Sequence, residues 1–341
     1  MRRSLTSILV LALSSAGLLA AQASHATPPG TVVKRTRDSK TQSSAPTVAW
    51  IPLKGTVGLD ASEQSFSAAA FRRCADQVRK SGCKILVLEI DSPGGRVDTK
   101  EEVIREILRL SDSGVRTIAF VHDAGSAAAL ITLACNEIFV MPASRVGAAV
   151  TILVGDSGPV SMKKVLKDDP ELEAKFRSFS SAIDDEAARA TKRCPCIARA
   201  MKEKEAELWH SPSGGFSDTS GAPEVVRIDS NSDVLTLTYT LMLSTGFAKR
   251  ATSSEDMLDQ LEVKKQSVLD LSSEIRSDER QLQKLIKTFE AQLNSLEEYQ
   301  SLVTGGGSNR QLEASRQKTM SGKKKKLEQA YEKVIEHLKV P

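Results

Sequence analysis

The stretch that decides the fold is "LEIDSPGGRVD", Leu88 to Asp98, in which an apolar run ends in Ser-Pro-Gly-Gly. A pattern typical of a helix begins directly after it, at "VDTKEEVIREILRLSDSG". Two adjacent glycines at the end of a buried strand serve one of two purposes. They form a tight turn, or they let the backbone approach another group closely and present N–H groups to it. Both interpretations are open at this point.

Strand and helix patterns alternate on both sides of this stretch. The strand-like runs are "TVAWIPLKGTV", "KILVLEID", "VRTIAFVHD", "EIFVMP" and "VGAAVTIL". The helical patterns between them include "SFSAAAFRRCADQVRKSG" and "SAAALITLACN". Continuous apolar strands separated by helices are typical of parallel strands that are covered on both faces. We therefore expect an α/β domain over residues 47–250.

The pattern changes from Asp256 onward. Apolar residues recur there at an unbroken spacing of seven, which predicts a long helix packed on a partner. Glycines 305–307 interrupt it, and a second helical pattern follows. Residues 256–341 are therefore expected to be a helical tail, as a hairpin, a coiled coil between chains, or a helix on the α/β domain. The residues of the stripe are Leu261, Val268, Ile275, Leu282, Phe289, Leu296 and Val303.

The first 46 residues are expected to stand apart from the fold. Arg2 and Arg3 precede an apolar run and then small residues, the pattern of a secretory signal peptide over residues 1–26. Cleavage after Ala26 or Ala23 predicts a periplasmic or extracellular protein, and retention as a membrane anchor is the alternative. Residues 27–46 are polar and rich in serine, threonine and proline, which indicates a linker.

Charge and cysteine usage narrow the classes of partner and cofactor. The net charge of +4 is spread over mixed-sign segments, so no nucleic-acid partner is expected. Lys323 to Lys326 form a basic run that suits a solvated helix face or contact with anionic lipid or an acidic partner. No metal or other cofactor is expected, because zinc-type ligand spacing is missing. The odd number of cysteines leaves at least one thiol unpaired, and a Cys74–Cys83 bridge stays open; the five are Cys74, Cys83, Cys135, Cys194 and Cys196.

Ser126 occupies a turn from a strand into a helix, between Gly125 and Ala127. A serine there projects its hydroxyl at a helix N-terminus, where backbone N–H groups and the helix dipole favour negative charge. The alternative is an ordinary helix N-cap, a role in which serine is common.

These motifs together resemble a known family. "EIDSPGG", followed by "GSAAALITLACNEIFVMPASRVGAA", is similar to the ClpP/crotonase superfold and most of all to the NfeD-type and signal-peptide-peptidase-type serine proteases. "KRCPCIARAM" and "LTLTYTLMLSTGFA" extend the resemblance over residues 47–263. It implies a ClpP/crotonase-like, mostly parallel sheet with flanking helices, ahead of the helical tail.

The resemblance also implies roles for individual residues. Ser126 matches the nucleophile, and Lys175 matches the general base of a Ser-Lys endopeptidase. Gly94 and Gly95 match glycines that line the oxyanion hole, with the N–H of Ala127 as a further donor. The family implies a polypeptide substrate, which we expect to be extended and apolar, and self-association into an oligomer.

The residues support a lysine base independently at one point. A Ser-His-Asp triad needs a histidine near the serine, and the histidines after Ser126 are His210, in a loop-like stretch, and His337, in the tail. His122 lies on the strand that precedes the serine. A lysine acts as a base only where burial lowers its pKa from about 10.4.

Three departures and alternatives accompany this interpretation. A long segment before Lys175 brings Lys163, Lys164 and Lys167, each an alternative base, close to it in the sequence. A catalytically inactive protease-like scaffold that binds partners through the tail is the main alternative function. A crotonase-type hydratase or isomerase is the third, and export to a compartment poor in coenzyme A argues against it.

Overall fold

The computed structural model of the 341-residue chain describes residues 47–58, 65–155, 158–165, 169–221, 224–229, 233–263, 268–304 and 310–339. The predicted signal peptide and linker, Lys167 and the glycines at 305–307 lie outside these residues. The described chain falls into two units, which divide between Lys284 and Leu285.

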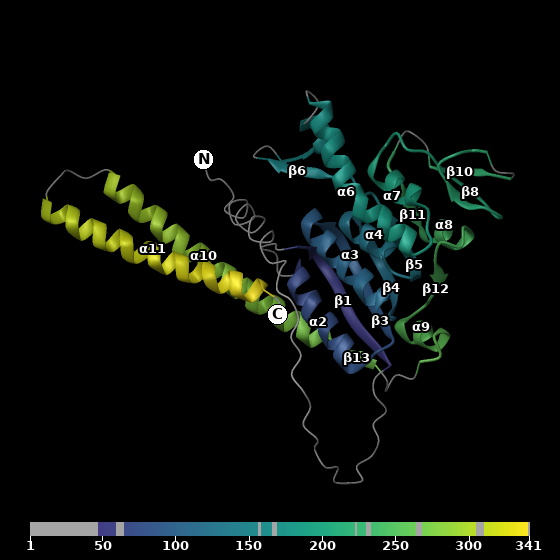
Figure 1. The fold of residues 1–341 in the computed structure, drawn as a ribbon, viewed down its shortest axis with the longest axis horizontal. Helices are drawn as coiled ribbons and strands as arrows, with labels where there is room; N and C mark the ends of the chain where they lie inside the picture. The colour runs from purple at the N-terminus through teal and green to yellow at the C-terminus, as the bar shows by residue number, and fades with distance from the viewer. Residues whose placement is uncertain are drawn as a thin grey trace, which may run out of the picture. The chain divides into compact units, whose positions relative to one another are not determined.

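The larger unit is an α/β domain (Figure 1). Its strands are β1 (Val48–Val57), β2 (Ser65–Phe66), β3 (Ile85–Gly95), β4 (Arg116–Gly125), β5 (Glu137–Gly147), β6 (Ile152–Gly155), β7 (Gly158–Ser161), β8 (Leu208–Ser211), β9 (Gly215–Ser217), β10 (Val226–Asp229), β11 (Thr236–Thr238), β12 (Lys249–Arg250) and β13 (Val268–Asp270). Its helices are α2 (Ala68–Ser81), α3 (Val97–Asp112), α4 (Ser126–Leu133), α5 (Met162–Val165), α6 (Pro170–Ala190), α7 (Pro195–Lys202), α8 (Tyr239–Ser244), α9 (Ser254–Gln260) and the start of α10 (Ser272–Thr304).

The main sheet has the order β11-β5-β4-β3-β1-β13, with β2 beside β1 and β12 beside β5. Every pairing in it is parallel except that of β11 with β5. The expected mostly parallel α/β fold with flanking helices and C-terminal helices is confirmed. Because β3 and β4 are parallel neighbours, their carboxyl ends lie at the same edge, and Ser92 pairs with Ala124 there.

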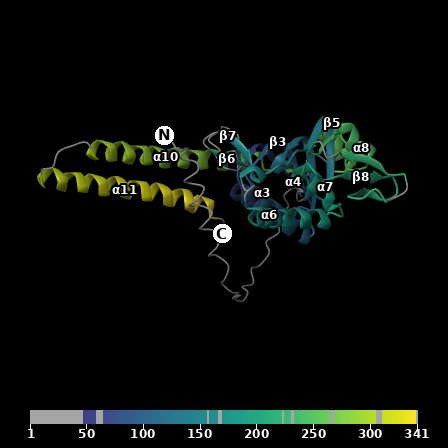
Figure 2. The same ribbon diagram turned by 90° about the horizontal axis from the view of Figure 1, so that it is seen from above.

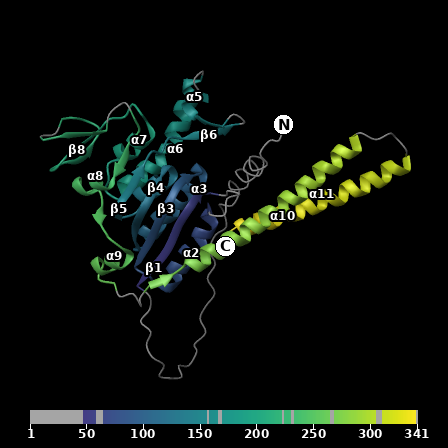
Figure 3. The same ribbon diagram turned by 180° about the vertical axis from the view of Figure 1, so that it is seen from behind.

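Apolar residues on both faces of the central strands explain their continuous hydrophobic sequence. On β3, Leu86, Leu88 and Ile90 join the large core beneath α2, α3 and α4, whereas Val87 joins a smaller cluster with Met257 of α9. Figure 2 shows α3, α4 and α6 together on one side of the sheet, and Figure 3 shows the opposite side with α9. Alternate side chains of a strand point to opposite faces, so only a sheet covered on both faces buries them all.

Local signals in the sequence explain where the helices begin and end. The Ser67 hydroxyl accepts a hydrogen bond from the Ala70 N–H at the start of α2, and Gly82 ends that helix in the left-handed conformation. Helix α6 begins in the same manner, with the Asp169 carboxylate accepting from the Leu172 N–H and Pro170 in the first turn.

Two sequence-based predictions of element boundaries were wrong. "EIFVMP" and "VGAAVTIL" were expected as two strands, but β5 runs unbroken from Glu137 to Gly147 and the second stretch is shared with β6. In the tail, Leu261 caps the end of α9 and Val268 lies in β13, parallel to β1. A spacing of seven residues does not distinguish a helix from apolar residues that a sheet edge buries.

The smaller unit is a helical hairpin of α10 from Leu285 and α11 (Arg310–Leu338), which lie side by side in Figures 1 to 3. The rings of Phe289 and Tyr331 have centroids 6.0 Å apart, and Lys323 Nζ donates to Ser295 Oγ at 2.5 Å. These pairings run in opposite directions along the two helices. The tail therefore takes the hairpin form, whereas Leu271, just before α10, and Ile275, in its first turn, pack into the core of the α/β domain.

One disulfide joins Cys194 to Cys196 at the start of α7, where the sequence shows no redox-type spacing. Cys74, Cys83 and Cys135 are buried free thiols. Burial raises the pKa of the Cys135 thiol to about 12. Within the part of the chain that the structure describes, no helix is both long and apolar enough to cross a membrane.

Candidate functional site

Ser126 lies where β4 ends at Gly125 and α4 begins, at the edge where the parallel strands terminate. Its backbone has a φ of +48°, a left-handed conformation that a residue with a side chain rarely adopts. The residue is half-buried, and its hydroxyl makes no hydrogen bond to any described residue. Ser126 is therefore not the N-cap of α4, because Gly125 holds that position and no side chain caps the helix. A strained serine with an uncommitted hydroxyl at a helix N-terminus is a candidate nucleophile.

Close backbone contacts around Ser126 explain why glycines occupy positions 94 and 95. A Cβ atom at Gly94 would lie 2.5 Å from the Cβ of Ser126 and 2.9 Å from the amide nitrogen of Ala127. A Cβ atom at Gly95 would lie only 2.0 Å from the carbonyl oxygen of Val57. Both glycines also have positive φ angles, +99° and +156°. Close approach of the backbone therefore accounts for the Gly-Gly pair.

The N–H groups at this turn differ in what they contact. The Gly94 N–H donates to the Ser92 hydroxyl at 3.1 Å. The Arg96 N–H donates to the Val57 carbonyl at 2.7 Å. Gly95, the residue before Arg96, is therefore the residue that lies opposite Val57 in the parallel pairing of β1 and β3. In a parallel pair of strands, a residue whose two chain neighbours bond to the adjacent strand directs its own N–H away from that strand. The Gly95 N–H therefore points away from β1, the side opposite Val57.

Arg193 fixes the other end of the helix that carries Ser126. Its guanidinium donates to the carbonyl oxygens of Leu133 at 3.1 Å, Cys135 at 2.6 Å and Asn136 at 3.3 Å. Leu133 is the last residue of α4, whose carbonyl has no partner within the helix, and Cys135 and Asn136 follow directly after the helix. Burial lowers the pKa of Arg193 from its usual value. Arg193 thus holds α4 at its far end without touching Ser126.

A cavity of about 50 Å³ adjoins Ser126. Its walls come from the end of β3, the starts of α3 and α4, the segment after β5, the part of α6 around residues 180–184, and the end of α7. The polar side chains in these walls include Ser126, Ser180 and three charged residues that sequence analysis did not identify. These three are Lys100, Asp184 and Lys202.

The structure does not bring Lys175 into this cavity. Lys175 is exposed on the first half of α6, five residues before Ser180, which does line the cavity. Five residues correspond to about 7.5 Å along a helix. Among the alternative bases, Lys164 is exposed on α5, and Lys167 lies outside the described residues. The assignment of the base therefore stays a prediction.

The described histidines of the α/β domain contact groups other than Ser126. His122, on β4, approaches the Glu89 carboxylate at 3.2 Å, and His210 makes an edge-to-face contact with Phe216 in the small sheet of β8, β9 and β10. His337 belongs to the last turn of α11 in the other unit. Neither His122 nor His210 lines the cavity beside Ser126.

The sequence contains a pattern that indicates the burial of Lys100 and Asp184. Lys100 lies three, four and seven residues before Val103, Ile104 and Ile107, all of which are buried on one face of α3. Asp184 has the same relation to Ala187 and Ala188 on α6. Residues at these spacings share a helix face, so a charge in an apolar stripe marks a buried ionic site.

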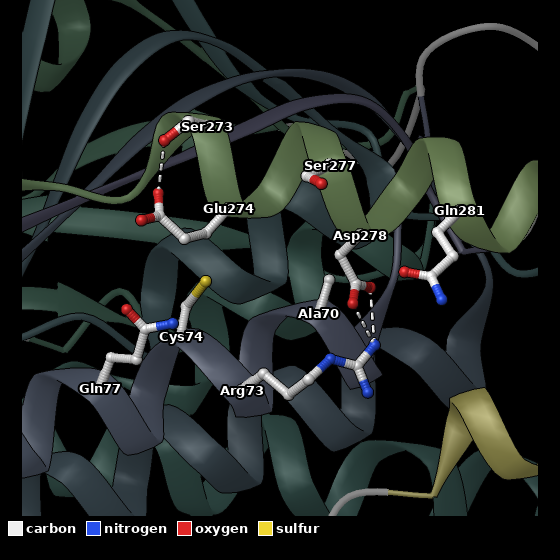
Figure 4. Close-up of a pocket in the computed structure, with 9 residues that line it drawn as sticks. All are labelled: Ala70, Arg73, Cys74, Gln77, Ser273, Glu274, Ser277, Asp278 and Gln281. Atoms are coloured by element: carbon white, nitrogen blue, oxygen red, sulfur yellow. Dashed lines mark hydrogen bonds and ion pairs between the residues drawn. The ribbon is translucent and has the colours of Figure 1, made fainter.

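A wider hollow of about 410 Å³ lies between α2 and the start of α10 (Figure 4). Arg73 of α2 approaches Asp278 of α10 at 2.6 Å there. Burial, then the nearby carboxylates of Glu274 and Asp278, raise the pKa of the Cys74 thiol in its wall to about 12. A thiol with a raised pKa is a poor nucleophile. The ion pair between Arg73 and Asp278 joins the two helices at this hollow.

Comparison with known proteins gives one family and a set of solved structures. Residues 47–271 match the family described as "NfeD1b, N-terminal domain". No curated protein matches this chain. A structure of the 1510-N membrane-bound stomatin-specific protease, in a form with one serine replaced by alanine, is 18% identical, covers 64% of this chain and 85% of its own, and has a TM-score of 0.44.

Two further structures of that protease are similar at a comparable level. A form with one lysine replaced by alanine, in complex with a substrate peptide, is 19% identical, covers 63% of this chain and 79% of its own, and has a TM-score of 0.43. The form from Pyrococcus horikoshii, described as specific for a stomatin homolog, is 16% identical, with coverages of 62% and 77% and a TM-score of 0.33.

Proposed function

The chain belongs to the family of the NfeD1b N-terminal domain, and from this premise we propose that it is a serine endopeptidase with a Ser-Lys dyad. The observation that carries the proposal is the backbone of Ser126. A φ of +48° on a serine costs free energy, about 1–3 kcal/mol. Glycine would adopt this conformation at a lower cost in free energy. The presence of serine here supports a functional role for its hydroxyl.

In the proposed mechanism, Ser126 Oγ attacks the carbonyl carbon of the scissile peptide bond. A negative charge then develops on the carbonyl oxygen, and the Ala127 and Gly95 N–H groups are proposed to stabilise it. Gly95 at the end of β3 and Ala127 both line the cavity beside Ser126, and Ala127 is in the first turn of α4, whose dipole adds to the effect. Each such donor typically lowers the barrier by about 3 kcal/mol.

Lys175 is proposed as the base that takes the Ser126 proton and returns it to the leaving amine. Its exposure requires that something cover the first half of α6 during the reaction, since a lysine base must be desolvated. Phe176 and Phe179 on the same half are exposed by 48% and 75%. A bound substrate or a second copy of the chain would bury these rings and Lys175 together.

The substrate is proposed to be an extended polypeptide with apolar side chains. Val97 and Ile152 are exposed, and both line the cavity beside Ser126. Exposed apolar residues next to a candidate nucleophile provide burial for apolar residues that flank the scissile bond. The signal-peptide pattern at residues 1–26 supports a site of action outside the cytoplasm.

The test incubates the chain from Thr27 onward, without the predicted signal peptide, with an unfolded apolar polypeptide. Mass spectrometry detects the cleavage products. Wild type is expected to cleave, and both Ser126→Ala and Lys175→Ala are expected to lose at least about a thousandfold in kcat. Ser244→Ala, which changes an exposed serine on α8, is the matched control and should cleave as wild type does. Circular dichroism checks that each variant is folded.

Labelling with a fluorophosphonate separates the nucleophile from the base. Wild type should be labelled at Ser126, and the Ser126→Ala variant should not be labelled. Cleavage that survives in Ser126→Ala would disprove the proposal. Cleavage that is lost only in Ser126→Ala would keep the protease and transfer the role of base to Lys163, Lys164 or Lys167.

The exposure of Lys175 favours a second candidate, a protease-like scaffold that binds partners without catalysis. This function predicts no fluorophosphonate labelling of Ser126 and no cleavage by any form across several unfolded substrates. Partner binding would then depend on the hairpin of α10 and α11 and would be unaffected by Ser126→Ala.

A further inference from the structure

Three charged side chains form a buried cluster beside the candidate nucleophile. Lys100 Nζ donates to Asp184 Oδ1 at 2.6 Å, and Lys202 Nζ donates to Asp184 Oδ2 at 3.0 Å. Lys202 also donates to Ser181 Oγ at 2.8 Å. The side chains of Lys100 and Asp184 are 3% and 1% exposed, and that of Lys202 is 11% exposed. One carboxylate is therefore shared between two ammonium groups.

This cluster faces the same cavity as Ser126, since all three charged residues line it. A cavity of about 50 Å³ holds a few water molecules, because one water needs roughly 10–15 Å³ by the same measure. It is large enough for a group of a few heavy atoms, such as a carboxylate, and too small for an aromatic side chain.

The charges in the cavity wall do not balance. Two ammonium groups and one carboxylate give a formal charge of +1, and the positive ends of the dipoles of α3 and α4 lie at the same wall. The Lys100 ammonium group makes only one hydrogen bond to the described residues, although it has three donors. An anion entering the cavity would meet donors that are already in place.

The cluster is poorly explained as a device for stability. Lys100 is the fourth residue of α3, where the helix dipole disfavours a positive charge. Replacing buried ion pairs by apolar side chains of similar size is often neutral or stabilising. A buried cation that lines a cavity beside a nucleophile is better explained by a ligand.

We propose that Lys100 and Lys202 form a subsite for a carboxylate group of the substrate, adjacent to the bond that Ser126 attacks. The proposal rests on the endopeptidase function proposed above and adds a charge requirement to the apolar substrate. An aspartate or glutamate side chain near the scissile bond and a free C-terminal carboxylate share the required chemistry. Asp184 positions both lysines and does not contact the substrate.

Binding to the full chain with Ser126→Ala tests the subsite apart from catalysis. The probes are four fluorescent apolar peptides of one sequence, with glutamate or glutamine at one position and a free or amidated C-terminus. At low salt, the preferred carboxylate peptide is expected to bind about tenfold more tightly than its uncharged counterpart, as one charge-assisted hydrogen bond predicts. The glutamate and C-terminal pairs identify the source of the carboxylate.

Substitutions at Lys202 and a nearby lysine test whether the cluster causes the preference. Adding Lys202→Gln, which leaves the cluster without net charge, should reduce the tenfold ratio to about one, and Lys202→Arg should restore it. Lys204→Gln is the matched control, because Lys204 is exposed and does not line the cavity, so the ratio should not change. Asp184→Asn should preserve or increase the ratio.

The outcomes separate this proposal from the proposed function. Equal affinity for charged and uncharged peptides would overturn the subsite, and so would a preference that survives Lys202→Gln, even if wild type cleaves both peptides. A carboxylate preference that follows the charge series, together with no cleavage by wild type, would support the subsite and overturn the endopeptidase.

Discussion

The two halves of the candidate dyad are built differently. Ser126 lies within van der Waals contact of the Gly94 backbone, and Arg193 holds the far end of its helix. Lys175 lies on the exposed first half of α6, and the second half of that helix is held by the buried Asp184. On the proposed mechanism, this difference means that the environment of Ser126 is complete within one chain, whereas Lys175 needs something to cover α6 before it can act as a base. The following predictions test this contrast.

Gly95→Ala is expected to have the largest effect. A Cβ atom 2.0 Å from the Val57 carbonyl would force β1 and β3 apart at the site. Overpacking and a disfavoured φ together should lower the free energy of unfolding by roughly 4–6 kcal/mol, and cleavage should be undetectable. Urea denaturation measures the first effect and peptide cleavage the second.

Gly114→Ala is the matched control for Gly95→Ala. Gly114 has a φ of +85°, but no atom of the described residues lies within 4 Å of its Cβ position. This variant should lose only about 1 kcal/mol and keep its activity. A similar loss in both variants would show that close packing at the nucleophile is unimportant.

Asp184→Ala is expected to have the next largest effect, because it leaves two buried ammonium groups without a carboxylate. Removing one partner of a buried ion pair typically costs about 3–5 kcal/mol. Asp185→Ala, at the neighbouring position, breaks only a pair with Arg189 at 3.9 Å on the surface and should cost less than about 0.5 kcal/mol. Equal losses in thermal unfolding would contradict the interpretation that the second half of α6 is anchored through Asp184.

Glu89→Gln should have a smaller and pH-dependent effect on the sheet that carries Ser126. Burial alone would raise the pKa of Glu89, but hydrogen bonds from Lys54 at 2.9 Å and Trp50 at 3.0 Å outweigh it and lower the pKa. A lowered folded-state pKa contributes stability above the unfolded pKa of about 4.3, and this is lost as the pH falls through the folded value.

We therefore expect wild type to be more stable than Glu89→Gln by about 1–2 kcal/mol at pH 7, with the difference shrinking below about pH 4. Urea titrations at several pH values measure this difference. A gap that stays constant down to about pH 2 would show that the carboxylate charge has no part in it.

Phe179→Ser should have the smallest effect on stability, within about 0.5 kcal/mol, because 75% of the side chain is exposed. On the proposed mechanism it should nevertheless raise KM for an apolar substrate or weaken self-association, which analytical ultracentrifugation detects. Unchanged cleavage and unchanged association would show that the first half of α6 needs no cover.

Most of the α/β fold is predictable from the sequence, because the signals for its strands and helices lie within each element or next to it. Continuous apolar strands, helix caps such as Ser67 and breaks at Gly82 and Gly114 identify β1, β3, β4, α2, α3 and α4 near their observed bounds. The boundary of the tail was not predictable from spacing, since the burial of Val268 comes from pairing with β1. That pairing joins residues far apart in the chain.

The same distinction applies to the candidate site. The turn at Ser126 and the glycines of β3 are adjacent to recognisable strands, so their place at one sheet edge follows from the parallel topology. Lys100, Asp184 and Lys202 belong to three different helices, and no local pattern shows that they meet. Only their positions on apolar helix faces indicate that each is buried.

The backbone of Ser126 has a consequence for how the protein would change under selection. Glycine adopts a φ of +48° without penalty, so Ser126→Gly would make the chain more stable while removing its hydroxyl. A library selected for heat resistance alone should enrich glycine at this position, and one selected for turnover should retain serine. The frequencies of glycine and serine at position 126 would then show whether selection acted on stability or on turnover.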